Sequence, residues 1–260
     1  MHGQARDTVV DGIRIRSYFL GADEEGRRTI VFLHGWGASA ESWLPIANAW
    51  SDSATRMLLI DLPGFGASDP PRRPAGVFEY RDLIAAVLDQ FGIRGAVLIG
   101  HSFGGSVAAT LAVARPELVS RLVLVDSSGI RNMNRGSRRL IRVIARFVRP
   151  LFRARGMQPF RRAIYRLIGS EDYIARPDLQ ESFRKIVAQD IQPILHRISQ
   201  PTLIVWGEKD LDTPLAHGRR FAELIAPAKL VVISGAGHYS FLDAPEAFLD
   251  ALQEFLQKSP

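Results

Sequence analysis

The 260-residue chain contains no cysteine. This absence excludes disulfide bonds, thiolate metal sites and a cysteine nucleophile, and it fits a reducing compartment. No run of about 18 consecutive apolar residues is present, so no segment is expected to span a membrane. Residues 1–20 also lack the apolar core of a secretory signal peptide. These absences predict a soluble protein, which we expect to be cytoplasmic.

Acidic residues and lysine are missing from one long stretch. Between Ser127 and Ser170 the charged side chains are twelve arginines, although the net charge of the whole chain is only +6. Within this stretch, residues 137–152 place arginines on one side of a helix and apolar residues on the other. Such a helix either packs its apolar face on the protein or lies on an anionic membrane surface. We expect the packed arrangement, with weak membrane association as the alternative. No nucleic-acid-binding motif accompanies the charge, so no nucleic acid partner is expected.

Short apolar runs and helical patterns alternate along the chain. Continuous hydrophobicity in a run is typical of strands that are buried on both faces of a parallel sheet. Alternation of strands and helices predicts an α/β fold with a doubly wound, mostly parallel sheet. Residues 8–21 alternate better and predict an antiparallel hairpin or edge strand. The predicted strands are 29–35, 56–64, 95–102, 121–129, 201–210 and 229–238, and the predicted helices are 78–92, 106–117 and 245–258.

The alternation stops between residues 128 and 197, where no strand-like run occurs. A structureless loop of that length is uncommon inside a compact domain. We therefore predict an all-helical cap at 128–197, inserted into an α/β core formed by 1–127 and 198–260. The cap is expected at the carboxyl edge of the sheet, where doubly wound folds place their chemistry.

Residues 100–105 read Gly-His-Ser-Phe-Gly-Gly, directly after a predicted strand and before a predicted helix. In this context G-x-S-x-G forms a nucleophile elbow, a sharp turn that presents the serine hydroxyl. The glycines relieve crowding around the turn, and the helix N-terminus adds positive potential beside the hydroxyl. The pattern predicts that Ser102 is a nucleophile, in contrast to a serine in an ordinary turn.

A serine nucleophile needs a base, which is oriented by an acid. His238 follows the last predicted strand and is the best candidate for the base. The remaining histidines lie at the terminus, at the end of the insertion, on a predicted helix, beside the serine and in a Gly-rich turn: His2, His196, His217, His101 and His34.

The acid is expected between Ser102 and His238 in chain order. Asp210 follows a predicted strand and fits best. Asp212 is a weaker candidate. Asp126, which follows the preceding strand, remains an alternative because an acid there could also reach the histidine.

An oxyanion that forms during acyl transfer needs two preorganised donors. The backbone N–H of Phe103 directly follows the nucleophile, and Trp36 lies in a Gly-rich turn after the first parallel strand. We predict that these two N–H groups form the oxyanion hole. The residues expected to contact the substrate flank these positions: His34, Gly35, His101 and Tyr239.

The sequence resembles the α/β-hydrolase superfamily with an inserted helical cap, over nearly its whole length. The similarity rests on "HGWG", "DLPGFGASD", "GHSFGG", "WGEKDLDTP" and "GAGHYSFLDAPEAF", which occur in the order of the family. The resemblance implies a serine hydrolase that works through an acyl-enzyme, with no cofactor and no metal. It is weakest over 128–197, where substrate choice is usually set in such proteins.

Within that superfamily, hydrolysis of a small-molecule carboxylic ester is the leading prediction. Carbon–carbon bond hydrolases of ring-cleavage products and thioesterases use the same triad and stay open. The carbon–carbon group usually has Trp after its catalytic histidine, whereas Tyr239 stands there in this chain. A hydrolase-like binding protein without turnover is the remaining alternative.

Overall fold

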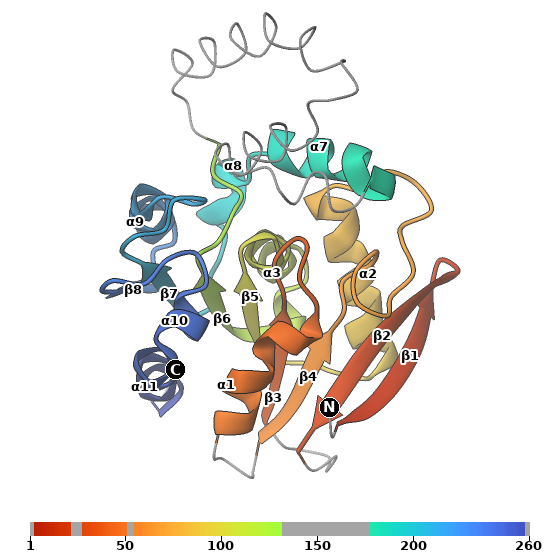
Figure 1. Cartoon of the computed structure of the whole chain (residues 1–260), viewed down its shortest axis with the longest axis horizontal. Helices are drawn as coiled ribbons and strands as arrows, with labels where there is room; N and C mark the ends of the chain where they lie inside the picture. Colours follow the sequence, from red (N-terminus) through yellow and green to blue (C-terminus); the bar gives the residue numbers. More distant parts are fainter. Residues whose placement is uncertain (1–2, 22–27, 51–54, 132–176, 258–260) are drawn as a thin grey trace, which may run out of the picture.

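The protein is built around one eight-stranded sheet with the order β1-β2-β4-β3-β5-β6-β7-β8 (Figure 1). The computed structural model describes residues 3–21, 28–50, 55–131 and 177–257. Strands β3 to β8 are mutually parallel, as the apolar runs predict, so the α/β fold class is confirmed. The strands are β1 (Gln4–Val10), β2 (Ile13–Leu20), β3 (Arg28–Leu33), β4 (Thr55–Ile60), β5 (Ala96–His101), β6 (Val119–Val125), β7 (Thr202–Gly207) and β8 (Ala228–Ile233).

The two antiparallel strands form the predicted hairpin at one edge of the sheet. β1 pairs with β2 along its whole length, and β2 pairs antiparallel with β4. The connection is Asp11-Gly12, and both residues have positive φ, 50° and 72°. A two-residue turn with two positive φ angles matches the twist of an antiparallel pair, and Asp-Gly is a preferred sequence for it.

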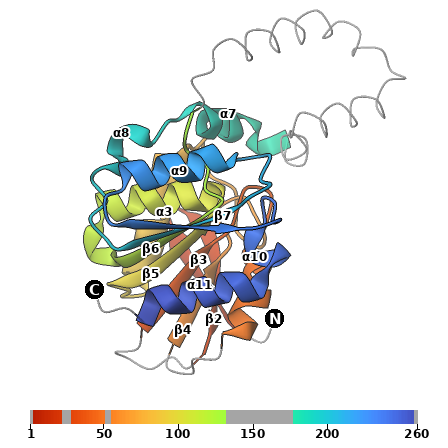
Figure 2. The same cartoon turned by 90° about the vertical axis from the view of Figure 1, so that its left-hand side faces the viewer.

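Each central strand contributes alternate residues to two hydrophobic cores. In β5, Leu98 faces one core and Ile99 faces the other, and both side chains are fully buried. The first core lies between the sheet and helices α2 (Val77–Gln90), α3 (Phe103–Ala114) and α9 (Leu215–Leu224). The second is covered by α1 (Leu44–Ala49) and α11 (Pro245–Gln257), and Figure 2 shows the layers from the side. Burial on both faces explains why the strands read as unbroken apolar runs.

Helix α3 begins three residues earlier than the predicted helix 106–117, directly after Ser102. It ends at Ala114, because Pro116 lacks the N–H that would continue the helix. A short 3-10 helix (Pro116–Leu118) connects α3 to β6. The early start matters for function, since it places the first free N–H groups of α3 beside the serine.

The described part of the predicted cap contains a 3-10 helix (Pro177–Leu179), α7 (Gln180–Ala188) and α8 (Gln192–Leu195). α7 is attached to the start of α2 by side-chain hydrogen bonds. Ser182 Oγ accepts from the N–H of Ala75 at 3.0 Å, and Gln189 Oε1 accepts from the N–H of Val77 at 2.6 Å. The basic helix predicted at 137–152 lies outside the described residues. Among the helices that the structure describes, none is long and apolar enough to cross a membrane.

Candidate active site

Ser102 sits in a strained turn between β5 and α3. Its φ and ψ are 49° and −114°, a conformation that residues with a side chain seldom adopt. A Cβ on Gly100 would lie 2.4 Å from the carbonyl oxygen of Gly104, so only glycine fits the first position of the elbow. The Ser102 N–H donates to the Val125 carbonyl at 2.9 Å, which anchors the turn to β6. The predicted elbow geometry is present.

Three side chains from separate strand ends form a hydrogen-bonded chain at the carboxyl edge of the sheet. His238 Nε2 lies 3.0 Å from Ser102 Oγ, and His238 Nδ1 lies 2.9 Å from Asp210 Oδ2. Ser102 follows β5, Asp210 follows β7 and His238 follows β8. The structure therefore brings together the three residues that the sequence singles out, although they are up to 136 positions apart.

The hydrogen-bond partners define the state of the imidazole. Because the Asp210 carboxylate only accepts, Nδ1 of His238 carries the proton and Nε2 is free to accept from the Ser102 hydroxyl. Burial disfavours the charged imidazolium, but the hydrogen bond and charge of Asp210 outweigh it and raise the pKa of His238. The side chain of His238 is 14% exposed, so a proton taken from Ser102 is shielded from bulk water.

Asp210 is held as a carboxylate by donors on both oxygens. Oδ1 accepts from the N–H groups of Asp212 and Thr213, each at 2.9 Å. Oδ2 accepts from the Thr213 hydroxyl at 2.6 Å, besides its contact with His238. Burial acts to raise the pKa of Asp210, but these interactions prevail and lower it. Asp212 donates its backbone N–H to Asp210, and the charge of its carboxylate adds to the raising of the His238 pKa.

Thr213 is a functional neighbour that the sequence analysis did not single out. Its hydroxyl contacts Asp210 and also lies 3.3 Å from His238 Nδ1. A signal for it exists in the sequence, since Asp210 stands three residues before Thr213 and just ahead of α9. An acidic residue that accepts from N–H groups two and three positions later is typical of the turn that precedes a helix.

The Gly-rich turn after β3 lies directly against the elbow. A Cβ on Gly35 would be 3.3 Å from Ser102 Cβ and 2.7 Å from His101 Nδ1, so this close approach requires glycine. Trp36 is the next residue, and Phe103 is the first residue of α3. The N–H groups of the two residues thus belong to segments that meet at the serine, as an oxyanion hole requires.

Aromatic rings cover one side of this site. The Trp36 indole packs against Phe65, Phe103 and Phe183, with ring centroids 4.8, 5.6 and 5.3 Å away. Phe183 belongs to α7, so the inserted segment contributes directly to the wall around Trp36. A wall of this composition favours an apolar group next to the nucleophile.

His34 does not have the position expected of a substrate contact. Its side chain is fully buried, and Nε2 accepts from the N–H of Leu62 at 2.9 Å. Burial lowers the pKa of His34 to about 4, which keeps the ring neutral at ordinary pH. The expectation that His34 contacts substrate is corrected: it joins the loops after β3 and β4 beneath the site.

His101 is likewise behind the site, with 1% of its surface exposed. Its Nε2 lies 2.7 Å from the carbonyl oxygen of His238, and burial lowers the pKa of His101 to about 3. The neutral ring donates to that carbonyl, so His101 supports the histidine loop and the expected substrate contact is corrected. Tyr239, in contrast, is 37% exposed, and its ring lies tilted against the His101 ring with the centroids 4.7 Å apart. Its position at the surface beside His238 is compatible with a substrate contact.

Asp126, the alternative acid, makes no hydrogen bond to the imidazole of His238 within the described residues. Its carboxyl group accepts from Gly207 and Ser240, and Asp210 occupies the orienting position. His217 lies on α9, where the sequence places it, and takes no part in the hydrogen-bonded chain of the triad.

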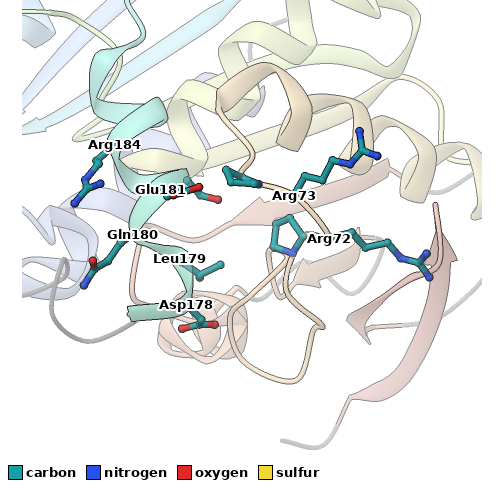
Figure 3. Close-up of a pocket in the computed structure, with 10 residues that line it drawn as sticks. Arg72, Arg73, Asp178, Leu179, Gln180, Glu181 and Arg184 are labelled. Carbon is teal, nitrogen blue, oxygen red and sulfur yellow. The ribbon is translucent and has the colours of Figure 1, made fainter.

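A separate cavity of about 380 Å³ lies between the loop 71–74 and the start of α7 (Figure 3). Neither Ser102 nor His238 lines it. The side chains of Arg72 and Arg73 extend away from Arg184 in Figure 3, so these cations do not converge on one point. The cavity therefore lacks the arrangement that recognises an anion.

Comparison with known proteins identifies the family. A model described as alpha/beta hydrolase family matches residues 30–251, which include all three members of the hydrogen-bonded chain. The protein belongs to the alpha/beta hydrolase family. It is thus a hydrolase, and the resemblance read from its motifs is confirmed.

The proteins that this chain resembles carry the names of different hydrolases. The chain is 26% identical to the uncharacterised hydrolase YugF of Bacillus subtilis, covering 97% of both chains. It is 27% identical to a 2-hydroxy-6-oxononadienedioate/2-hydroxy-6-oxononatrienedioate hydrolase of a Pseudomonas species, covering 90% of this chain and 89% of the relative. A solved membrane phospholipase A superposes with a TM-score of 0.79 at 25% identity, covering 98% of this chain and 86% of the other.

Proposed function

We propose that this hydrolase cleaves carboxylic esters through an acyl-enzyme on Ser102. The observation that carries the proposal is the hydrogen-bonded chain from Ser102 through His238 to Asp210, built on a strained elbow. This arrangement supplies a nucleophile, a base with a free Nε2 atom and an acid that fixes the tautomer.

The reaction follows from these contacts. Nε2 of His238 takes the hydroxyl proton as Ser102 Oγ attacks the ester carbonyl, and the imidazolium that forms is stabilised by Asp210. The N–H groups of Trp36 and Phe103 donate to the oxyanion of the tetrahedral intermediate. The C–O bond then breaks, and the alcohol leaves with the proton from His238. Water attacks the acyl-enzyme in the same way, releasing the acid and restoring Ser102.

Two observations favour an ester among the possible substrates. The residue after His238 is Tyr239, whereas the carbon–carbon hydrolases usually have Trp at that place. The 25% identical membrane phospholipase A is an ester-cleaving enzyme by its name. The 27% identical 2-hydroxy-6-oxononadienedioate hydrolase supports carbon–carbon bond hydrolysis as the second candidate, on the same triad.

Hydrolysis of p-nitrophenyl butyrate by the wild type and by Ser102→Ala tests the proposal. We expect turnover by the wild type and a loss of at least about a thousandfold in the variant, because the covalent route is closed. Ser106→Ala is the matched control, since Ser106 lies in α3 and its hydroxyl bonds to the Ser128 hydroxyl rather than to a triad side chain. Turnover that survives in Ser102→Ala would overturn the assignment of the nucleophile.

A substrate panel separates the ester from the alternatives. The wild type is expected to favour p-nitrophenyl esters over acyl-CoA thioesters and over ring-cleavage dienes. A preference for the dienes would replace the ester with the second candidate. Reaction of Ser102 with a fluorophosphonate reports an active serine whichever substrate is preferred, and its absence would indicate a binding protein.

A further inference from the structure

Asp126 is a fully buried acidic residue for which the proposed reaction has no step. It directly follows β6 and has a positive φ of 45°, so the chain turns sharply there as it does at Ser102. Asp is among the few residues with a side chain that enter this conformation readily. A buried carboxyl group is costly unless donors surround it, so its partners indicate what it does.

The two oxygens of Asp126 reach two different segments of the site. Oδ1 accepts from the N–H of Gly207 at 2.7 Å, and Gly207 is the last residue of β7. Oδ2 accepts from the N–H of Ser240 at 3.1 Å and lies 2.6 Å from the Ser240 hydroxyl. Gly207 is three residues before Asp210, and Ser240 is two residues after His238. One carboxyl group therefore connects the loop that carries the acid to the loop that carries the base.

The backbone of Asp126 adds a second connection to the acid. Its N–H donates to Val205 in β7 at 3.0 Å, and its carbonyl oxygen lies 3.0 Å from the Thr213 hydroxyl. That hydroxyl contacts Asp210 Oδ2 at 2.6 Å. The loops after β7 and β8 are thus both held by hydrogen bonds to Asp126, which directly follows β6.

We propose that Asp126 is a positioning residue that sets the distance between Asp210 and His238 by bridging their two loops. The inference rests on the proposed function, because it assigns those two residues to the reaction. Rate depends steeply on such distances, since displacement of a catalytic group by about 1 Å can cost about a hundredfold.

Asp126→Asn tests the bridge with a change of one atom. An amide has a single carbonyl oxygen, so it accepts from Gly207 or from Ser240, and its NH₂ group then faces the other N–H. Asn also tolerates the positive φ, which keeps the turn itself accessible. We expect kcat for p-nitrophenyl butyrate to fall about tenfold or more with little change in KM, and the rate of fluorophosphonate labelling to fall in parallel.

Glu208→Gln is the matched control. Glu208 also bridges the end of β7 to the loop after β8, since its carboxylate accepts from the N–H of Gly235 at 2.9 Å and from the Ser234 hydroxyl at 2.8 Å. It is exposed and makes no contact with the triad within the described residues. The Glu208→Gln variant should react with the fluorophosphonate at the wild-type rate.

If Asp126→Asn does not fold, Ser240→Ala removes one donor from the bridge and should lower the labelling rate severalfold.

A spectroscopic signal separates positioning from a general loss of stability. The proton shared by His238 Nδ1 and Asp210 gives a low-field NMR resonance, which should shift or broaden in Asp126→Asn and stay unchanged in Glu208→Gln. An unchanged resonance with wild-type labelling in Asp126→Asn overturns the proposal.

A wild type that is not labelled at all overturns the proposed function, and the positioning role with it. Labelling that survives in Asp210→Asn but is lost when Asp126→Asn is added would make Asp126 the orienting acid, contrary to the proposal.

Discussion

The ring of His101 holds the backbone of His238: Nε2 of the first lies 2.7 Å from the carbonyl oxygen of the second. His101, which precedes Ser102 in the chain, therefore holds the backbone of His238, the residue proposed to activate Ser102. Since burial keeps His101 neutral, its Nε2 is the donor, and Nδ1 lies against Gly35 with no hydrogen-bond partner among the described residues.

Replacing His101 should slow the reaction according to whether the new side chain can donate. In His101→Leu the His238 carbonyl loses its buried donor, and we expect kcat to fall about tenfold, the equivalent of one buried hydrogen bond. His101→Gln places an N–H near the position of Nε2 and should recover much of that loss. Steady-state kinetics on p-nitrophenyl butyrate, with thermal unfolding of both variants, measures the effect. Equal rates in the two variants would contradict the donor role.

The pH profile of kcat/KM should follow His238. The base works only when Nε2 is unprotonated, so activity should rise with pH through an inflection above the ordinary pKa of His, as its raised pKa requires. Asp210→Asn removes the two largest interactions that raise the pKa of His238, while the lowering by burial and the smaller raising effects of the Asp212 and Asp126 charges remain. The inflection should therefore move to lower pH, and kcat should fall by about 10⁴. An inflection that stays in place in Asp210→Asn would show that another group sets it.

Asp126 should give the protein a stability that declines with pH. Burial raises the pKa of Asp126 to about 7, against 3.8 for a free carboxyl group. A raised pKa means that the folded state binds more protons than the unfolded state, so the contribution is full below about pH 4 and is lost as pH rises through about 7. Asn does not titrate. Urea unfolding across this range should show the stability advantage of wild type over Asp126→Asn shrinking as pH increases. A constant or growing advantage would contradict the raised pKa.

The attachment of α7 to the core depends on Gln189. Its Oε1 accepts from the N–H of Val77 in the first turn of α2, where no intrahelical acceptor exists. Gln189→Ala should lower the free energy of unfolding by about 1 kcal/mol. Gln180→Ala is the control, because Gln180 lies at the other end of α7 and no such bond to α2 is present there within the described residues. Equal losses of unfolding free energy in Gln189→Ala and Gln180→Ala would contradict a specific attachment of α7 through Gln189.

Phe183 should influence the length of the acyl group that the site accepts. It packs against Trp36 from α7, so Phe183→Ala removes part of the apolar wall and leaves room beside the indole. The ratio of kcat/KM for p-nitrophenyl octanoate to that for the butyrate should rise by roughly tenfold. Val187→Ala is the matched change, since Val187 lies on the same helix but is 51% exposed. A ratio that stays at the wild-type value in Phe183→Ala would place the acyl group elsewhere.

Much of the fold follows from local pattern. Strands such as 95–102 are unbroken apolar runs because both faces of the sheet are covered, and that pattern predicted their parallel pairing. Helix boundaries were less accurate, as in α3, where the helix starts at the elbow itself. The order of Ser102, Asp210 and His238 along the chain, each after a strand, was enough to predict that they would meet at one edge.

The sequence by itself determined the α/β sheet, the elbow around Ser102 and the choice of His238, and it ranked Asp210 first among three acids, because each of these signals lies in adjacent residues or at the end of a strand. The hydrogen bond to His238 that selects Asp210 over Asp126 is visible only in the structure. Only the tertiary structure decided what His34, His101 and Asp126 do. Their roles depend on hydrogen bonds to segments distant in sequence, such as the bond from Asp126 to Ser240, 114 positions away. Hydrophobic periodicity reports which face of an element is buried, but the partner of a buried polar group is set by how the strand ends come together.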